Sequence, residues 1–143
     1  MSSVIRALKY LLGWPGLVVG VAIAMATALY LDARSFKAVT NSALIEQLLE
    51  GYTLKSEGFS FYYASDGRVV GEVSGTYDVG EWEALDNVYC EQWQVWGEGV
   101  RRSWTISTAE DRVRRKGFGY PFNENDLPVN EFSRVKGNQI YSQ

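Results

Sequence analysis

The segment from Leu11 to Leu31, LLGWPGLVVGVAIAMATALYL, constrains the fold more than any other part of the chain, because it contains no charged residue. A bilayer core about 30 Å thick is crossed by about 20 apolar residues of an α-helix. A backbone in lipid has to satisfy its own hydrogen bonds, and a helix does so within one segment. The sequence therefore predicts a transmembrane helix over 11–31, preceded by an N-terminal tail, 1–10.

A cleaved secretory signal is the alternative interpretation of this segment. Such signals combine a basic start, an apolar stretch of about 7 to 15 residues and a small-residue cleavage site. Arg6 and Lys9 supply the basic start, and Ala26-Thr27-Ala28 resembles a cleavage site. The apolar run is longer than a usual signal core, which favours an uncleaved anchor. A buried core helix is disfavoured, because a small domain cannot cover an apolar helix on all sides.

The flanking charges bear on the orientation of this helix. Arg6 and Lys9 precede it and Arg34 and Lys37 follow it, so the bases that the positive-inside rule counts are balanced. A short tail is easily retained, and a domain after a first span is often exported. We therefore expect a single-pass protein of the bacterial inner membrane, with a cytoplasmic N-terminus and a periplasmic domain.

Glycines in the first half of the segment leave one helix face small. Gly16 and Gly20 are spaced for close approach of a second helix, and Gly13 adds to the same region. These three glycines are candidate packing residues for a partner membrane helix. Ordinary glycine content of a membrane helix is the alternative.

The remainder of the chain predicts one soluble domain, 42–143, after a linker, 32–41. Asn41 and Ser42 are typical N-cap residues, and Gly51 is typical of a helix C-terminus. The apolar residues between them recur at helical spacing. We therefore expect a short amphipathic helix there.

Turn residues and alternating apolar residues follow from Tyr52 onward. Asp66-Gly67 and Asp86-Asn87 are typical of hairpin turns. About six strands with short links predict a mainly β fold, either an antiparallel meander with a lipocalin-like sheet or a partial barrel. The tail from Gly119 is expected to be loop, with a short closing strand near Gln139-Ile140-Tyr141.

The sequence contains no histidine and one cysteine, Cys90. It therefore lacks the commonest general base and metal ligand, and it cannot form an intrachain disulfide. Acids surround Cys90, so we expect a buried or half-buried thiol rather than a reactive one. No catalytic residue, metal ligand or cofactor is predicted. The region 32–143 carries all 17 acidic residues of a chain whose net charge is −3, which argues against nucleic-acid binding.

Glu81 and Glu83 flank Trp82 on one side of a predicted strand. Two carboxylates at a suitable separation can hydrolyse glycosides. Alternating acids on a solvated strand face are far more common, and we favour that interpretation.

Charge is distributed unevenly along the domain. Acids without a base occupy the stretch from Val69 to Val100, and bases dominate from Arg101 to Lys116. Attraction between the outward faces of neighbouring hairpins is the favoured explanation. Docking onto a charged partner surface or onto lipid headgroups is the alternative. The candidate docking residues are Arg101, Arg102, Arg112, Arg114, Arg115 and Lys116.

Tryptophans fall on successive predicted strands, at Trp82, Trp93, Trp96 and Trp104. A small domain can use such rings to fill its core, which is the favoured interpretation. A barrel can also line a cavity with them and hold an apolar ligand. Exposed rings would instead contact a partner protein.

The order of these features resembles a family of small alphaproteobacterial proteins with a lipocalin-like domain of unknown function. The matching residues are Gly51-Tyr52-Thr53, Asp66-Gly67, Gly80-Glu81-Trp82 and Cys90-Glu91-Gln92-Trp93. The resemblance covers roughly 42–118 and implies a lipocalin-like fold. Relatives carry further cysteines and signal peptides, whereas this chain has Ser103 and Thr105 in that region and a predicted anchor. These departures suggest that the fold is retained and the role differs.

These observations favour a non-catalytic protein. We expect an accessory subunit of a larger membrane protein complex, respiratory or photosynthetic in type, anchored by one helix and contacting its partners through the β domain. The alternative is a membrane-tethered, lipocalin-like carrier or sensor of a lipophilic ligand. An envelope enzyme that uses carboxylates has little support.

Overall fold

The structure is a computed structural model that describes residues 35–123 and 127–140 of the 143-residue chain. The predicted membrane segment 11–31 lies outside the described residues, and so do its candidate packing glycines Gly13, Gly16 and Gly20. Within the described ranges, no helix combines the length and the apolar character needed to cross a bilayer.

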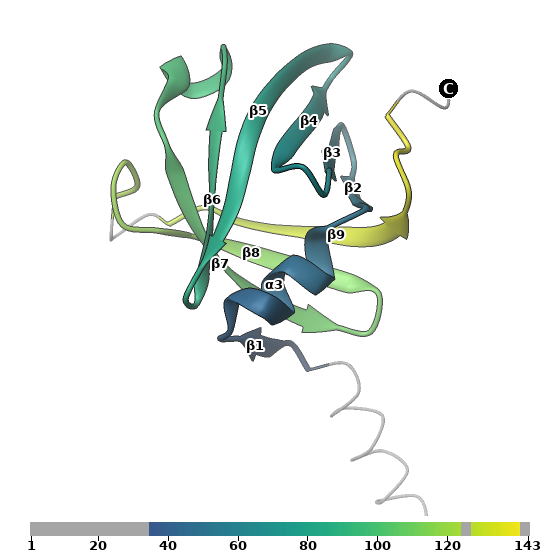
Figure 1. Ribbon diagram of the computed structural model, residues 1–143, viewed down its shortest axis with the longest axis vertical. Coiled ribbons are helices and arrows are strands. Elements are labelled where there is room, and N and C mark those ends of the chain that lie inside the picture. The colour runs from purple at the N-terminus through teal and green to yellow at the C-terminus, as the bar shows by residue number, and fades with distance from the viewer. Residues whose placement is uncertain (1–34, 124–126, 141–143) are drawn as a thin grey trace, which may run out of the picture. The chain divides into compact units, whose positions relative to one another are not determined.

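Eight strands, β2 to β9, form a closed antiparallel barrel in which each strand pairs with the next along the chain (Figure 1). Pairing of β9 with β2 closes the barrel. The strands are β2 (Tyr52–Ser56), β3 (Phe59–Tyr63), β4 (Arg68–Val73), β5 (Thr76–Leu85), β6 (Val88–Trp93), β7 (Arg102–Ala109), β8 (Arg112–Phe118) and β9 (Val129–Lys136). A closed barrel is consistent with a lipocalin-like fold and confirms the mainly β prediction.

The structure corrects the predicted number of strands, about six, and shows a closed barrel where the sequence predicts a lipocalin-like sheet or a partial barrel. The sequence predicts loop where β9 lies and a closing strand at 139–141, but Gln139 and Ile140 follow β9 without strand structure. Phe132 is the one buried side chain of β9, so this segment lacks the alternation that identifies a strand. Ladders with β2 on one edge and β8 on the other hold it in the barrel.

One helix, α3 (Ser42–Leu49), is confirmed at the expected place. The Oδ1 of Asn41 accepts a hydrogen bond from the backbone N–H of Ala43 at 2.9 Å, which caps the helix. Ile45 and Leu49 are fully buried in the barrel core. Because Glu50 bridges the last residue of β3, α3 lies at the barrel end where β3 finishes.

A short strand, β1 (Lys37–Val39), forms within the predicted linker 32–41. It pairs with β7 over Ile106–Thr108. The same edge of β7 pairs with β6 only over Arg102–Trp104, so the rest of that edge would otherwise be unpaired. β1 therefore covers a gap in the barrel wall beside α3.

Because consecutive strands run in opposite directions, alternate links between strands lie at opposite ends of the barrel. These two ends differ in the links they carry. The end with α3 has tight turns, including Gly67, whose φ of 82° favours glycine, and Asp86, whose φ is 50°. The other end carries the longer links, among them a 3₁₀-helix, η1 (Trp96–Gly99), between β6 and β7. We call these the helix end and the loop end.

Candidate ligand cavity in the barrel

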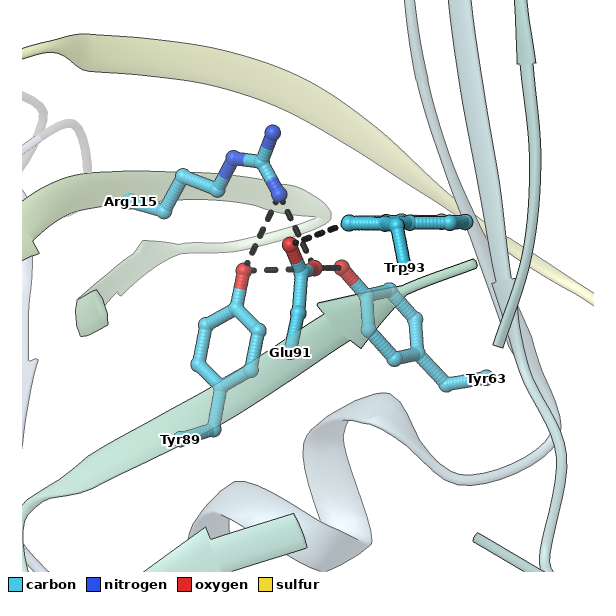
Figure 2. A network of polar contacts seen from close by, with 5 residues as sticks. All are labelled: Tyr63, Tyr89, Glu91, Trp93 and Arg115. Atoms are coloured by element: carbon cyan, nitrogen blue, oxygen red, sulfur yellow. Dashed lines mark hydrogen bonds and ion pairs between the residues drawn. The ribbon is translucent and has the colours of Figure 1, made fainter. Parts of the chain in front are cut away.

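A charged pair lies inside the barrel, between Glu91 on β6 and Arg115 on β8 (Figure 2). The Nη1 of Arg115 donates to Oε1 of Glu91 at 3.0 Å. The side chain of Glu91 is 1% exposed and that of Arg115 is 8% exposed. Two charges so far from water are stable only when both are paired and hydrogen-bonded.

Three further side chains complete the network around Glu91. The hydroxyl of Tyr63 donates to Oε1 at 2.5 Å, and Nε1 of Trp93 donates to Oε2 at 3.3 Å. The hydroxyl of Tyr89 accepts from Nη1 of Arg115 at 3.3 Å and lies 3.4 Å from the Tyr63 hydroxyl. Figure 2 shows these groups converging on the carboxylate, and the residues belong to β3, β6 and β8.

Burial and charge shift the ionisation of this network. Burial, and then the negative charge of Glu91, raises the pKa of Tyr63 well above its ordinary value. The same two causes raise the pKa of Tyr89. Burial lowers the pKa of Arg115, but Tyr89 and Glu91 more than offset this, so its pKa lies above the ordinary value. Both tyrosines are therefore neutral hydrogen-bonding groups, and Arg115 is a permanent cation.

Aromatic rings surround the guanidinium of Arg115. Its Cζ lies 4.2 Å from the ring centroid of Trp104, 4.6 Å from that of Phe61 and 5.0 Å from that of Phe132. Cations are attracted to the faces of such rings, and the attraction is stronger away from water. The rings therefore pack around the guanidinium in the barrel interior.

A cavity of about 330 Å³ adjoins this network. Its position follows from its lining, since Phe59, Val73 and Trp96 all lie near the loop end. Gly71 on β4 gives the tryptophans room, because a Cβ on it would lie 2.7 Å from the ring of Trp93. The full lining is Phe59, Phe61, Val73, Glu91, Trp93, Trp96, Arg102, Trp104, Arg115, Phe122, Pro128, Asn130 and Phe132.

Three of the lining residues present buried N–H groups that lack a hydrogen-bond partner among the described residues. These groups are Nε of Arg102, Nε1 of Trp104 and Nε of Arg115. An unmet buried donor is costly, and native proteins leave few of them. The residues that carry these unmet donors thus form part of the aromatic wall of the cavity.

The four predicted tryptophans divide between the cavity and the core. Trp93, Trp96 and Trp104 line the cavity, and the rings of Trp93 and Trp96 lie 4.9 Å apart. Trp82 lies elsewhere, where its Nε1 donates to the backbone carbonyl of Ala64 at 3.0 Å. Trp96 lies in η1 rather than on a strand.

The six predicted docking bases do not share one surface. Arg115 is inside the barrel, and Arg102 lines the cavity. Arg101 pairs with Glu83 at the surface, and Lys116 is exposed. Arg112 and Arg114 both pair with Glu131, at 2.9 and 3.1 Å. Of the acids in these pairs, Glu83 belongs to the acidic stretch and Glu131 does not, so the favoured interpretation of the charge pattern stays a prediction.

The predicted carboxylate pair Glu81 and Glu83 is exposed on β5. Cys90 is buried, as expected, and its Sγ lies 3.2 Å from Oγ of Ser103. Within the ranges 35–123 and 127–140, no cluster of acids and cysteine is arranged to hold a metal ion.

Sequence reasoning missed the central network because it treated Glu91 and Arg115 as surface charges. Strand alternation was the available signal. Glu91 is in phase with Tyr89 and Trp93, and Arg115 is in phase with Val113, so each charge shares a face with core residues.

A scan against protein-family models finds no match to this chain, and neither a search of curated proteins nor one of solved structures finds any. The resemblance to the alphaproteobacterial family therefore stays a prediction.

Proposed function

We propose that the barrel binds a small, largely apolar ligand in its interior and acts as a carrier or sensor of that ligand. The observation that carries this proposal is the aromatic cavity of about 330 Å³. Small-molecule sites are concave, mostly apolar, and supplied with a few well-placed polar groups. Closed barrels of eight strands are wide enough to hold one small ligand.

The layering of the barrel supports the same proposal. Residues at the helix end, such as Ile45, Leu49 and Val113, are fully or almost fully buried and fill that end. The Glu91–Arg115 pair forms a polar layer across the middle. Beyond it, toward the loop end, the aromatic rings line a space instead of filling it. The filled helix end and the polar layer therefore form the floor of the cavity.

Calorimetric titration of the full chain tests the proposal. The chain is reconstituted in phosphatidylcholine nanodiscs and titrated with 1-naphthalenemethanol, a neutral aromatic alcohol, with empty nanodiscs as the blank. We expect saturable binding at one site per chain. Heat that matches the blank would contradict the proposal.

Two variants locate the binding. Val73→Phe places a ring at a position that lines the cavity. Val95→Phe places the same ring at a surface position, where the valine is 74% exposed. We expect Val73→Phe to weaken binding about tenfold or more, because it occupies the space that the ligand needs. Val95→Phe is expected to bind like the parent chain. Equal effects would place the ligand outside the cavity.

The accessory-subunit prediction remains a second proposal, since the cavity does not bear on it. Exposed apolar side chains at the loop end, such as Tyr120 at 83%, are the observation that favours a protein contact. Native purification from membranes separates the two proposals. Co-migration with one stoichiometric complex supports the subunit, and a monomer that carries a small molecule supports the carrier.

A further inference from the structure

The buried donors of the cavity bear on the chemistry of the ligand. We infer that the cavity binds an apolar monocarboxylate, whose carboxylate meets the N–H groups of Arg102, Trp104 and Arg115 and whose apolar body lies against Trp93 and Trp96. This inference rests on the proposed function and names the ligand class for the same cavity.

The net charge of the lining residues favours an anionic ligand. Among the described residues that line the cavity, the charged ones are Glu91, Arg102 and Arg115. Two cations and one anion leave one net positive charge next to aromatic walls. A ligand with a single negative charge neutralises the cavity, whereas a cation would meet an unfavourable field.

The hydrogen bonds within the network leave donors of Arg115 available. Glu91 already accepts from Tyr63, Trp93 and Nη1 of Arg115. The Nη2 and Nε of Arg115 have no bond within the network drawn in Figure 2, and Nε is buried without a partner among the described residues. The pair therefore holds the guanidinium in place and leaves N–H groups of it for a second acceptor.

Arg102 provides a second cation that faces the cavity. It is in phase with Trp104 along β7, so both side chains face the interior, whereas its neighbour Arg101 faces outward and pairs with Glu83. The guanidinium of Arg102 lies against the backbone of Gly97 in η1, where a Cβ would collide with it. Its Nε is buried without a partner in the described ranges. Arg102 thus supplies a positioned cation that forms no ion pair within those ranges, with Glu91 opposite it on β6 and paired to Arg115.

A matched pair of ligands isolates the charge. The full chain in nanodiscs is titrated with 1-naphthaleneacetate and with 1-naphthaleneacetamide, which have the same ring and nearly the same shape. We expect the acetate to bind about tenfold or more tightly than the amide, since hydrogen bonds to a carboxylate are stronger than those to a neutral oxygen. Octanoate and octanamide, titrated in the same way, decide whether an acyl chain or an aryl ring is preferred.

Variants assign the preference to the donors. We expect Arg102→Gln and Trp104→Phe each to reduce the preference for the acetate to about threefold or less, with binding of the amide nearly unchanged. Arg101→Gln is the matched control and is expected to keep the full preference. Urea unfolding of each variant verifies that it folds, and Arg115 is left intact because its loss would disturb the core.

Several results would overturn the inference. Equal affinities for acetate and amide would mean that water meets the buried donors and would leave the proposed function standing. Equal losses in Arg101→Gln and Arg102→Gln would mean that general surface charge attracts the acid. Failure of both naphthalene ligands while 1-naphthalenemethanol binds would reject the carboxylate alone. Failure of all three would reject the proposed function as well.

Discussion

Glu91 and Arg115 form an ion pair in the middle of a closed β-barrel, with Nη1 and Oε1 separated by 3.0 Å. Their strands, β6 and β8, do not pair with each other, since β7 lies between them. The contact therefore spans β7 on the inner face of the barrel wall.

Breaking this pair is expected to destabilise the fold severely. Glu91→Gln leaves the Arg115 cation buried without its counter-ion, and such changes cost about 3–5 kcal/mol. Urea unfolding measures the loss. Glu131→Gln is the control, because Glu131 pairs with Arg112 and Arg114 near the surface, where ion pairs contribute about 0–1 kcal/mol. Similar losses in the two variants would show that the inner pair is hydrated.

Removal of the Tyr63 hydroxyl tests the hydrogen bond to Glu91. Tyr63→Phe keeps the ring but removes the 2.5 Å bond, and a hydrogen bond to a charged group contributes about 1.5–3 kcal/mol. We expect a loss in that range by urea unfolding. Tyr62→Phe, on the same strand but facing the other side, is expected to cost far less. An unchanged free energy of unfolding in Tyr63→Phe would argue against the hydrogen bond between Tyr63 and Glu91.

Alkaline pH is expected to destabilise the barrel through Tyr63 and Tyr89. The pKa of each is raised in the folded state, so each favours folding below the ordinary tyrosine value of 10.0, and this contribution is lost as pH rises above it. Tyrosinate absorbance should show both residues ionising together with unfolding. The slope of unfolding free energy against pH above about 10 should become shallower in the double Phe variant. Tyr120→Phe, at an exposed position, should leave it unchanged.

Gly71 is expected to control the position of the cavity tryptophans. A Cβ there would lie 2.7 Å from the Trp93 ring and would also collide with Trp96, so Gly71→Ala has to displace the rings. Such overpacking costs about 1–3 kcal/mol. Urea unfolding and tryptophan fluorescence measure the two effects. Adding Trp96→Leu should recover part of the loss, and a strictly additive double variant would contradict the contact.

The sequence was sufficient for features set by short-range chemistry. Asn41 and Gly51 bound the helix because cap groups act within one turn, and the prediction of α3 was correct. Asp66-Gly67 and Asp86-Asn87 marked their hairpins because few residues adopt positive φ readily. The mainly β class followed from the same signals.

Closure of the sheet was a tertiary outcome. β9 carries one buried residue, Phe132, and gave no alternation to detect, yet β2 and β8 both need its edges. Backbone groups of those two strands would be unpaired without it, and unpaired buried backbone is costly. The number of strands therefore depended on neighbours far away in the sequence.

The sequence by itself determined the uncharged segment 11–31, the helix α3, the hairpins that follow it, the lack of histidine and the single cysteine. Only the tertiary structure decided which charges lie inside. In the sequence, Glu91 belongs to the acidic stretch and Arg115 to the basic stretch. The barrel brings their side chains together in its interior. The reason is that alternation assigns a side chain to one of two faces, whereas closure of the sheet decides which face excludes water.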